Sequence, residues 1–136
     1  MLSLCHITHS YTLVFVIAIV AIGVYGNYRC KHPQYKDVLE TRLGDTTLDG
    51  WSLTHFFFFG FVGYKYPHTL VLSLGLGVAW ELFEHYYGKL RPGWLGGFGD
   101  CPNLQSDYNE TGNWWYGKWS DVLLNTLGFL LGAWFN

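Results

Sequence analysis

The sequence predicts an all-α, polytopic integral membrane protein with four transmembrane helices and a long loop before the last helix. Half of the 136 residues are hydrophobic, a fifth are aromatic and only 13% are charged, whereas about 25% are charged in a typical soluble domain. The apolar residues form four stretches that are separated by polar or proline-containing segments. We therefore predict one membrane domain, residues 1–136, with helices at about residues 11–26, 51–66, 69–87 and 119–135.

The first predicted helix, residues 11–26, consists of aliphatic side chains, small residues and aromatics, and it carries no charge. A signal peptide has a similar apolar run, but it usually carries positive charge before that run, and residues 1–10 contain no Lys or Arg. We therefore expect a membrane anchor. The next segment, residues 27–50, carries four basic and four acidic residues and is predicted to be a loop.

The second and third predicted helices form a tight hairpin, because Pro67 cannot continue a helix. The second helix has 16 residues and the fourth has 17, close to the lower limit of about 17 for crossing a bilayer. We expect them to cross a thin membrane or to begin below its surface. Residues 88–118 are rich in Gly, Trp and polar residues and are predicted to be a long loop, a kind of segment that is often functional.

The last predicted helix combines a polar beginning with a face of small residues. Asp121, Asn125, Gly128 and Gly132 follow one another at spacings of four, three and four, so they share one face. A charged or amide side chain in a membrane is costly unless it meets a partner, and a Gly-x-x-x-Gly pair lets a neighbouring helix approach closely. We therefore expect a helix to pack on this face, either from the same chain or in a homodimer.

Two features of the loops indicate opposite sides of the membrane. With four helices, residues 27–50 and 88–118 lie on one side and hold four and three Lys or Arg residues, against Lys65 alone on the other side. The positive-inside rule then predicts cytosolic loops. However, Asn109-Glu110-Thr111 is an N-glycosylation sequon, which is usable only in a lumenal loop. The sequence leaves this orientation open.

The cysteines and the net charge limit the classes of function. Cys5, Cys30 and Cys101 are too scattered for a Cys-type zinc site, whose ligands usually come in close pairs. Cys30 and Cys101 fall on the same predicted side, where they either form a disulfide or remain free thiols. The net charge of −2 gives no general attraction to nucleic acid, so we expect no nucleic-acid partner.

Ionisable and amide side chains of three predicted helices converge at one depth, just below the loop side. They are His55 of the second helix, Glu81 and Glu84 of the third, and Asp121 and Asn125 of the fourth. Carboxylates held close together in a poorly solvated place cannot all ionise unless a cation joins them or some take up protons. Oxygen-rich ligands suit a hard divalent cation such as calcium, magnesium or manganese.

Two histidines are candidate bases or additional ligands, because imidazole titrates near neutral pH. His55 lies inside the second helix, whereas His85 precedes two tyrosines that are typical of the membrane interface. A structural role is the alternative for the whole set, since acids and histidines in membrane helices also pair to hold a bundle together. Ionisable residues inside a membrane are nevertheless a functional site by default.

These residues, with their aromatic and glycine neighbours, resemble the catalytic core of base-exchange phosphatidylserine synthases over residues 49–132. The similarity rests on the following pattern: His55-Phe56, Trp80-Glu81-x-x-Glu84, Trp114-Trp115, Trp119, Asp121-Val122-Leu123, Asn125, Leu127-Gly128 and Gly132. The chain is shorter than those enzymes and would be a minimal version of their core. More loosely, it resembles VanZ-like membrane proteins, which share a histidine helix, a glutamate helix and an Asp-x-x-x-Asn-x-x-Gly helix.

The resemblance implies calcium-dependent exchange of a phospholipid head group with serine or another small alcohol, a transferase reaction of lipid biosynthesis. It gives catalytic roles to His55, Glu81 and Asp121, with proton transfer assigned to His55. The implied calcium ligands are Glu81, Glu84 and Asp121, and the residues expected to support the substrate are Asn125, His85, Trp114 and Trp115. The expected location is a multi-pass position in a membrane, of endoplasmic-reticulum type if the source is eukaryotic or viral.

Two alternatives to base exchange remain open. If water attacked in place of serine, the same site would make the chain a phospholipase. If the polar cluster only binds lipid or an ion, or only holds the helices together, the chain is a non-catalytic, VanZ-like membrane protein. A dependence on metal separates these readings, because a purely structural bundle is indifferent to chelators.

Overall fold

The computed structural model describes residues 2–35, 37–90, 101 and 116–136, and this part of the chain is all-α. Its four α-helices are α1 (Leu2–Lys31), α2 (Gly50–Lys65), α3 (Leu70–Leu90) and α4 (Trp119–Trp134). Two short 3-10 helices, η1 (Val38–Glu40) and η2 (Pro67–Thr69), lie in the connections before and after α2. The all-α fold class that the sequence predicts is therefore confirmed.

The first helix is longer than predicted at both ends, since it covers Leu2–Lys31 and not only residues 11–26. Residues 2–22 contain neither Gly nor Pro, so nothing in the sequence stops the helix before the apolar run. After the run, the helix continues until Pro33, which disfavours the helical conformation of the residue before it. The other three helices begin and end within three residues of their predicted bounds.

Helices α2 and α4 pack with their backbones in contact, and glycines make this approach feasible. A Cβ atom on Gly128 would collide with the carbonyl oxygen of Phe56, and one on Gly132 with the carbonyl oxygen of Gly60. From the other side, a Cβ atom on Gly63 would collide with the carbonyl oxygen of Phe129. The helix that packs on the Gly128 and Gly132 face therefore belongs to the same chain.

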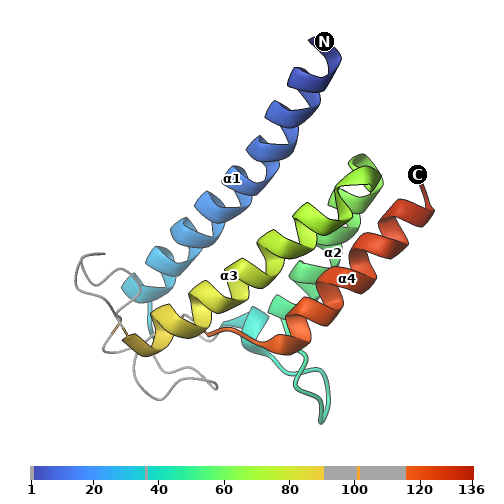
Figure 1. Cartoon of the computed structure of the whole chain (residues 1–136). Helices are drawn as coiled ribbons and strands as arrows, with labels where there is room; N and C mark the ends of the chain where they lie inside the picture. Colours follow the sequence, from blue (N-terminus) through green and yellow to red (C-terminus); the bar gives the residue numbers. More distant parts are fainter. Residues whose placement is uncertain (1, 36, 91–100, 102–115) are drawn as a thin grey trace.

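Helix α1 contacts the other helices from its middle to its end, and its N-terminal part extends beyond them (Figure 1). Near its middle, the Tyr11 hydroxyl lies 3.0 Å from Ser73 Oγ, and the Phe15 ring packs edge-on against Phe58. Near its end, the Tyr25 ring packs edge-on against Trp51 of α2. The space between these two attachments is a cavity, which borders the candidate site.

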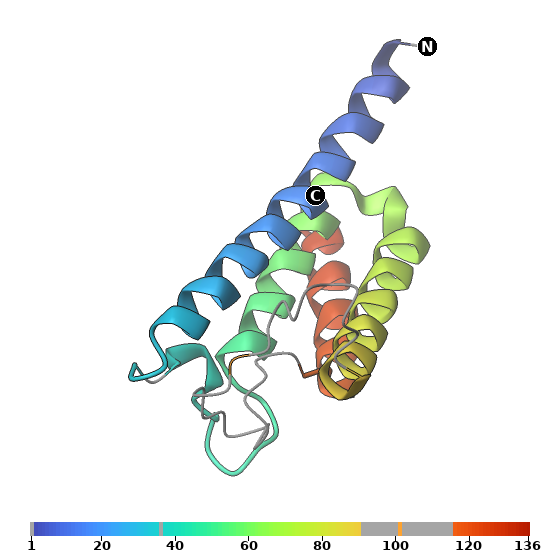
Figure 2. The same ribbon diagram turned by 90° about the vertical axis from the view of Figure 1, so that its left-hand side faces the viewer.

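Four helix termini lie at one end of the molecule. In both views, the ends of α1 and α3 and the beginnings of α2 and α4 lie together, opposite the two termini and the α2–α3 turn (Figures 1 and 2). A disulfide between Cys30, at the end of α1, and Cys101 joins α1 to the α3–α4 connection at this end. Of the two alternatives for these cysteines, the structure has the disulfide.

Within the described helices, one stretch is long and apolar enough to cross a membrane, His9–Lys31 in α1, with a mean hydropathy of 1.8. Helices α2 and α4 have 16 residues each, and a membrane-spanning helix usually has about 17 to 25. Helix α3 is longer but carries Glu81 and Glu84. The number of membrane crossings therefore stays a prediction.

Candidate functional site

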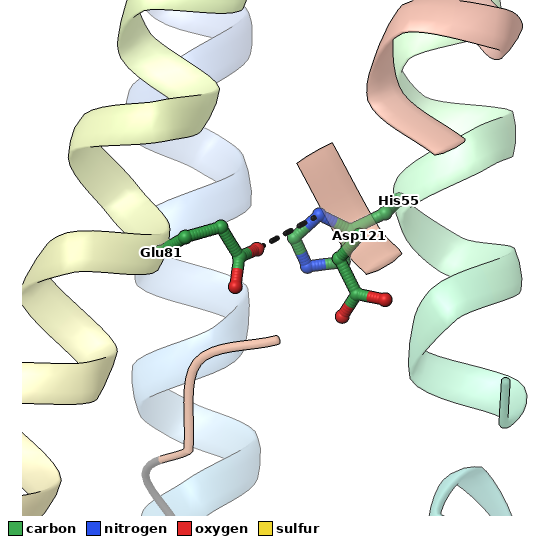
Figure 3. Close-up of side chains that lie close together, drawn as sticks. All are labelled: His55, Glu81 and Asp121. Atoms are coloured by element: carbon green, nitrogen blue, oxygen red, sulfur yellow. Dashed lines mark ion pairs between the residues drawn. The ribbon is translucent and has the colours of Figure 1, made fainter. Parts of the chain in front are cut away.

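Three ionisable side chains from three different helices meet near the end of the molecule where α2 and α4 begin. His55 comes from α2, Glu81 from α3 and Asp121 from α4, and one potential ligand atom of each lies within 4.8 Å of the others. Figure 3 shows the His55 ring between the two carboxylates. Glu81 and Asp121 are each only 3% exposed. The structure thus brings together the three residues for which the sequence predicted catalytic roles.

His55 is held by the amide of Asn125. Its Nδ1 atom lies 3.0 Å from Asn125 Oδ1 and 3.6 Å from Glu81 Oε1. An amide oxygen can only accept a hydrogen bond, so Nδ1 carries the proton and donates it to Asn125. In the neutral ring, Nε2 then keeps a lone pair that can accept a proton or bind a metal.

Asp121 is held by a buried network that begins at the first residue before α2. Asp49 caps that helix, because its Oδ1 accepts a hydrogen bond from the backbone N–H of Ser52 at 2.9 Å. The Ser52 hydroxyl donates to Asp121 Oδ1 at 2.6 Å. Lys118 Nζ lies 2.7 Å from Asp49 Oδ2 and 3.9 Å from Asp121 Oδ2. The network fixes one oxygen of Asp121 and supplies one positive charge next to it.

Glu81 is held by the backbone at the beginning of α4. The N–H of Lys118 donates to Glu81 Oε2 at 2.8 Å. This contact requires the chain to run close to α3, and Gly117 makes it feasible, since a Cβ atom there would collide with the carbonyl oxygen of Glu81. The other oxygen, Oε1, is buried and accepts no hydrogen bond from any residue that the structure describes.

The chemistry of this set fits a divalent cation. Two buried carboxylates and an imidazole surround one point, and Glu81 Oε1 is a buried acceptor without a hydrogen-bond donor. Such an atom costs free energy unless something positive or a donor meets it. The single ammonium of Lys118 faces Asp49, so its one positive charge does not neutralise the carboxylates of Asp49, Glu81 and Asp121 together. Glu81 and Asp121 are therefore the residues that would hold a cation, and carboxylate oxygens suit hard divalent ions such as calcium. The His55 ring lies beside them and offers Nε2 as a proton acceptor.

The structure gives the other predicted site residues different places. Asn125 is buried beside His55, as described above, whereas His85 is exposed. Glu84 lies on the wall of the neighbouring cavity, so His55 and not Glu84 completes the three-residue group. The reason is helical geometry, because a residue three positions after Glu81 is turned by about 60° around the axis. Trp114 and Trp115 lie outside the described residues.

The sequence interpretation missed Asp49, Ser52 and Lys118, although all three contact the site. Asp49 had a local signal, since an Asp directly before an apolar helix is typical of a helix cap. Lys118 and Ser52 had none, because their contacts join residues 66 and 69 positions apart. Only the packing of α2 against α4 makes them neighbours.

An apolar cavity of about 570 Å³ borders the three-residue group. Most of its wall comes from α1, α2 and α3, with Tyr116 and with Asp121 of α4 completing it, and aromatic and aliphatic side chains predominate. Three ionisable residues line it as well: His55, Glu84 and Asp121. The polar group and the apolar cavity therefore form one continuous site.

Comparison of the chain with protein-family models, with curated proteins and with solved structures found no match. The fold and the site together define an all-α protein in which a buried group of histidine and carboxylates opens into an apolar cavity.

Proposed function

We propose that the chain is a multi-pass membrane enzyme that exchanges the head group of a phospholipid for serine, with the help of a divalent cation, calcium being the expected ion. The observation that carries the proposal is the meeting of His55, Glu81 and Asp121 at the wall of an apolar cavity. The site thus combines a proton acceptor, a possible cation site and room for hydrocarbon. The resemblance of the sequence to base-exchange phosphatidylserine synthases supports the same reaction.

The distribution of polar and apolar side chains supports a membrane location for all four helices. Among the residues whose side chains the structure describes, four of the six largest fully buried ones are polar: Asn125, Asp49, Ser52 and Ser73. By contrast, large apolar residues face outward from each later helix, for example Phe57, Val71 and Leu123, which are 67%, 86% and 61% exposed. Such an outer surface is unfavourable in water and favourable in lipid.

The disulfide supports a site on the non-cytosolic side. Disulfides form and persist in oxidising compartments and are rare in the cytosol. The Cys30–Cys101 bridge lies at the same end of the molecule as the three-residue group. This agrees with the Asn109 sequon and disagrees with the positive-inside rule. In a eukaryotic cell, this would be the lumenal side of an endoplasmic-reticulum-type membrane.

Glu81 and Asp121 would hold the cation, each being fixed through its other oxygen. Lys118 N–H fixes Glu81 Oε2, and Ser52 Oγ fixes Asp121 Oδ1. A divalent cation bound there supplies positive charge to the oxygens of the phosphodiester, where negative charge increases during displacement. The residues around the carboxylates keep them oriented, so little reorganisation is needed when substrate binds.

His55 would move the proton. Its Nε2 atom takes the proton of the serine hydroxyl while the serine oxygen forms a bond to phosphorus. The bond from phosphorus to the head-group oxygen then breaks, and the imidazolium returns the proton to that oxygen. The products are phosphatidylserine and the free head-group alcohol. Asn125 keeps the ring oriented, because its Oδ1 accepts the Nδ1 proton.

A non-catalytic role is the second candidate, and specific contacts favour it too. The contact of His55 with Glu81 and the ion pair of Lys118 with Asp49 are of the kind that hold helices together. A VanZ-like protein that binds lipid or an ion would use the same residues. The two candidates differ in whether serine enters phospholipid, and in whether chelators matter.

The test is the incorporation of labelled serine into phospholipid by the purified protein in liposomes, with and without calcium. His55→Ala is the test variant, and His68→Ala is the matched control, because His68 is an exposed histidine in η2, at the opposite end of the bundle. We expect calcium-dependent incorporation that His55→Ala loses and His68→Ala keeps. Release of head group without incorporation would indicate a phospholipase. If the folded protein forms neither product, this result contradicts the proposal and favours the second candidate.

A further inference from the structure

We infer that one acyl chain of the lipid lies in the cavity between α1 and the α2–α3 pair, so that α1 forms the wall of a chain-binding slot and is more than an anchor. The inference rests on the proposed function and adds the place where the hydrocarbon goes. It concerns α1, which lies outside residues 49–132, the part of the chain that resembles a known family.

The slot exists because α1 contacts the other helices on either side of residues 16–21. Before them, Tyr11 contacts Ser73 and Phe15 packs against Phe58. After them, Ile22 packs against the cluster of Tyr87 and Cys101, and Tyr25 packs against Trp51. The cavity of about 570 Å³ lies between these two sets of contacts.

Small residues on both walls keep the slot wide. From α1, Ala18 and Ala21 line the cavity, and from α3 the wall includes Gly77 and Ala79. Larger side chains at Ala18, Ala21 and Ala79 would fill space that the slot now leaves open, whereas a Cβ atom on Gly77 would collide with Asn125 Nδ2. Ile19 also lines the cavity and is 49% exposed, so the slot is reachable from the outer, lipid-facing surface of the helices.

The two parts of the cavity wall require an amphipathic occupant. His55, Glu84 and Asp121 line the same cavity as the apolar residues, so one part of an occupant meets ionisable groups and the rest meets hydrocarbon. Cavities of about 300–1,000 Å³ typically hold small-molecule ligands. A further helix, about 10 Å wide and 30 Å long when it spans a membrane, is too large for this one. A lipid, with its phosphate at the ionisable groups and a chain along α1, matches both parts.

The slot orients the bound lipid and adds little to its binding affinity. Lipid tails are about as apolar as the side chains of the wall, so moving a chain from the bilayer into the slot changes its free energy little. What the slot does is hold the chain in one direction, so that the phosphate comes to rest beside Glu81 and Asp121. Narrowing the slot should therefore impair long-chain lipids and spare short-chain ones.

The experiment is photo-crosslinking in nanodiscs with a phosphatidylcholine that carries a diazirine midway along one acyl chain. Ala18→Phe narrows the slot from α1, and Ala79→Phe narrows it from α3, so a folding failure of one variant leaves the other to decide. Val20→Phe is the matched control, because Val20 is on α1, is 57% exposed and does not line the cavity. Crosslinked peptides are identified by mass spectrometry.

We expect crosslinks concentrated on the slot residues of α1 and α3, reduced at least fivefold in Ala18→Phe or Ala79→Phe and unchanged in Val20→Phe. Crosslinks spread evenly around α1, or crosslinks of α1 to a second copy of the chain, would overturn the inference. Crosslinking needs no catalysis, so slot labelling without serine exchange would keep the slot and reject the proposed function. Serine exchange with evenly spread labelling would support the proposed function and reject the slot.

A second readout uses chain length. Serine exchange is compared for dioleoyl and dihexanoyl phosphatidylcholine in each variant. We expect Ala18→Phe to lower the rate with the long-chain lipid at least fivefold and to leave the short-chain rate within twofold of wild type. Equal loss with both lipids would overturn the slot, because it would indicate a general defect of the site.

Discussion

Lys118 and Asp49 form a buried ion pair that connects the beginning of α4 to the beginning of α2, with Nζ 2.7 Å from Oδ2. Asp49 is fully buried, and it caps α2 as well. The same Lys118 holds Glu81 through its backbone N–H. One residue thus organises both carboxylates of the candidate cation site, Glu81 directly and Asp121 through Ser52.

Removing the ammonium should destabilise the fold. In Lys118→Met, the Asp49 carboxylate loses its positive partner while it remains buried, which typically costs about 3–5 kcal/mol. We expect a lower midpoint of thermal unfolding in detergent. The double variant Asp49→Asn with Lys118→Met removes both charges and should recover more than half of the loss. A single variant as stable as wild type would show that the pair contributes nothing.

The close approach of α2 and α4 should be sensitive to one added methyl group. Gly128→Ala places a Cβ atom against the carbonyl oxygen of Phe56, so the helices must separate. We expect a loss of about 1–3 kcal/mol in unfolding free energy, as is usual for overpacking. Gly75→Ala is the matched control, because a Cβ atom there meets nothing within 4 Å. It should be neutral or stabilising by up to about 1 kcal/mol, and equal losses in both variants would contradict the packing argument.

The amide of Asn125 should matter to the chemistry of His55 more than to folding. Asn125→Ala removes the acceptor of the Nδ1 proton, so the ring loses its fixed tautomer and orientation. Residues that orient a site in this way typically contribute about 10–100-fold to activity or metal affinity. We expect serine exchange to fall by that amount, and 15N NMR of the imidazole to show a mixture of tautomers. Thr126→Val, which changes the neighbouring residue, is the control, and an unchanged tautomer in Asn125→Ala would contradict the role.

The disulfide should be intact in the native protein. Cys30 and Cys101 are 71 residues apart, and a cross-link that closes such a loop typically stabilises a fold by about 4 kcal/mol. We expect both cysteines to resist maleimide until a reductant is added, and Cys30→Ser to unfold at a lower temperature. Cys5→Ser is the control. Immediate alkylation of both thiols without reductant would contradict the bridge and the assignment of the site to an oxidising side.

The helical parts of the fold were predictable because their signals are local. Apolar runs bounded by Pro67 and by polar segments predicted α2, α3 and α4 to within a few residues, and the spacing of Gly128 and Gly132 predicted a closely packed neighbour. Helix α1 was predicted too short, because apolar content marks the apolar part of a helix and not its ends. The wide separation of α1 from α3 had no sequence signal, since it depends on which side chains meet across helices.

The sequence predicted which residues form the site, but only part of their arrangement. The positions of His55, Glu81 and Asp121 along their helices predicted that they lie at the same level. In the structure, one ligand atom of each lies within 4.8 Å of the others. Depth alone could not separate Glu81 from Glu84, because the angle around α3 decides which of them faces Asp121. Lys118 was counted as a loop charge, and its contacts arise only when the beginnings of α2 and α4 come together.

The most direct test of the account is the binding of calcium to the purified protein in detergent, measured by isothermal titration calorimetry after removal of metal by a chelator. Glu81→Gln with Asp121→Asn is the test variant, and Asp45→Asn, at an exposed turn, is the control. We expect one calcium ion per chain, bound by wild type and by the control and lost in the double variant. Binding that survives in the double variant, or no binding by a folded wild-type protein, would contradict a cation site formed by Glu81 and Asp121.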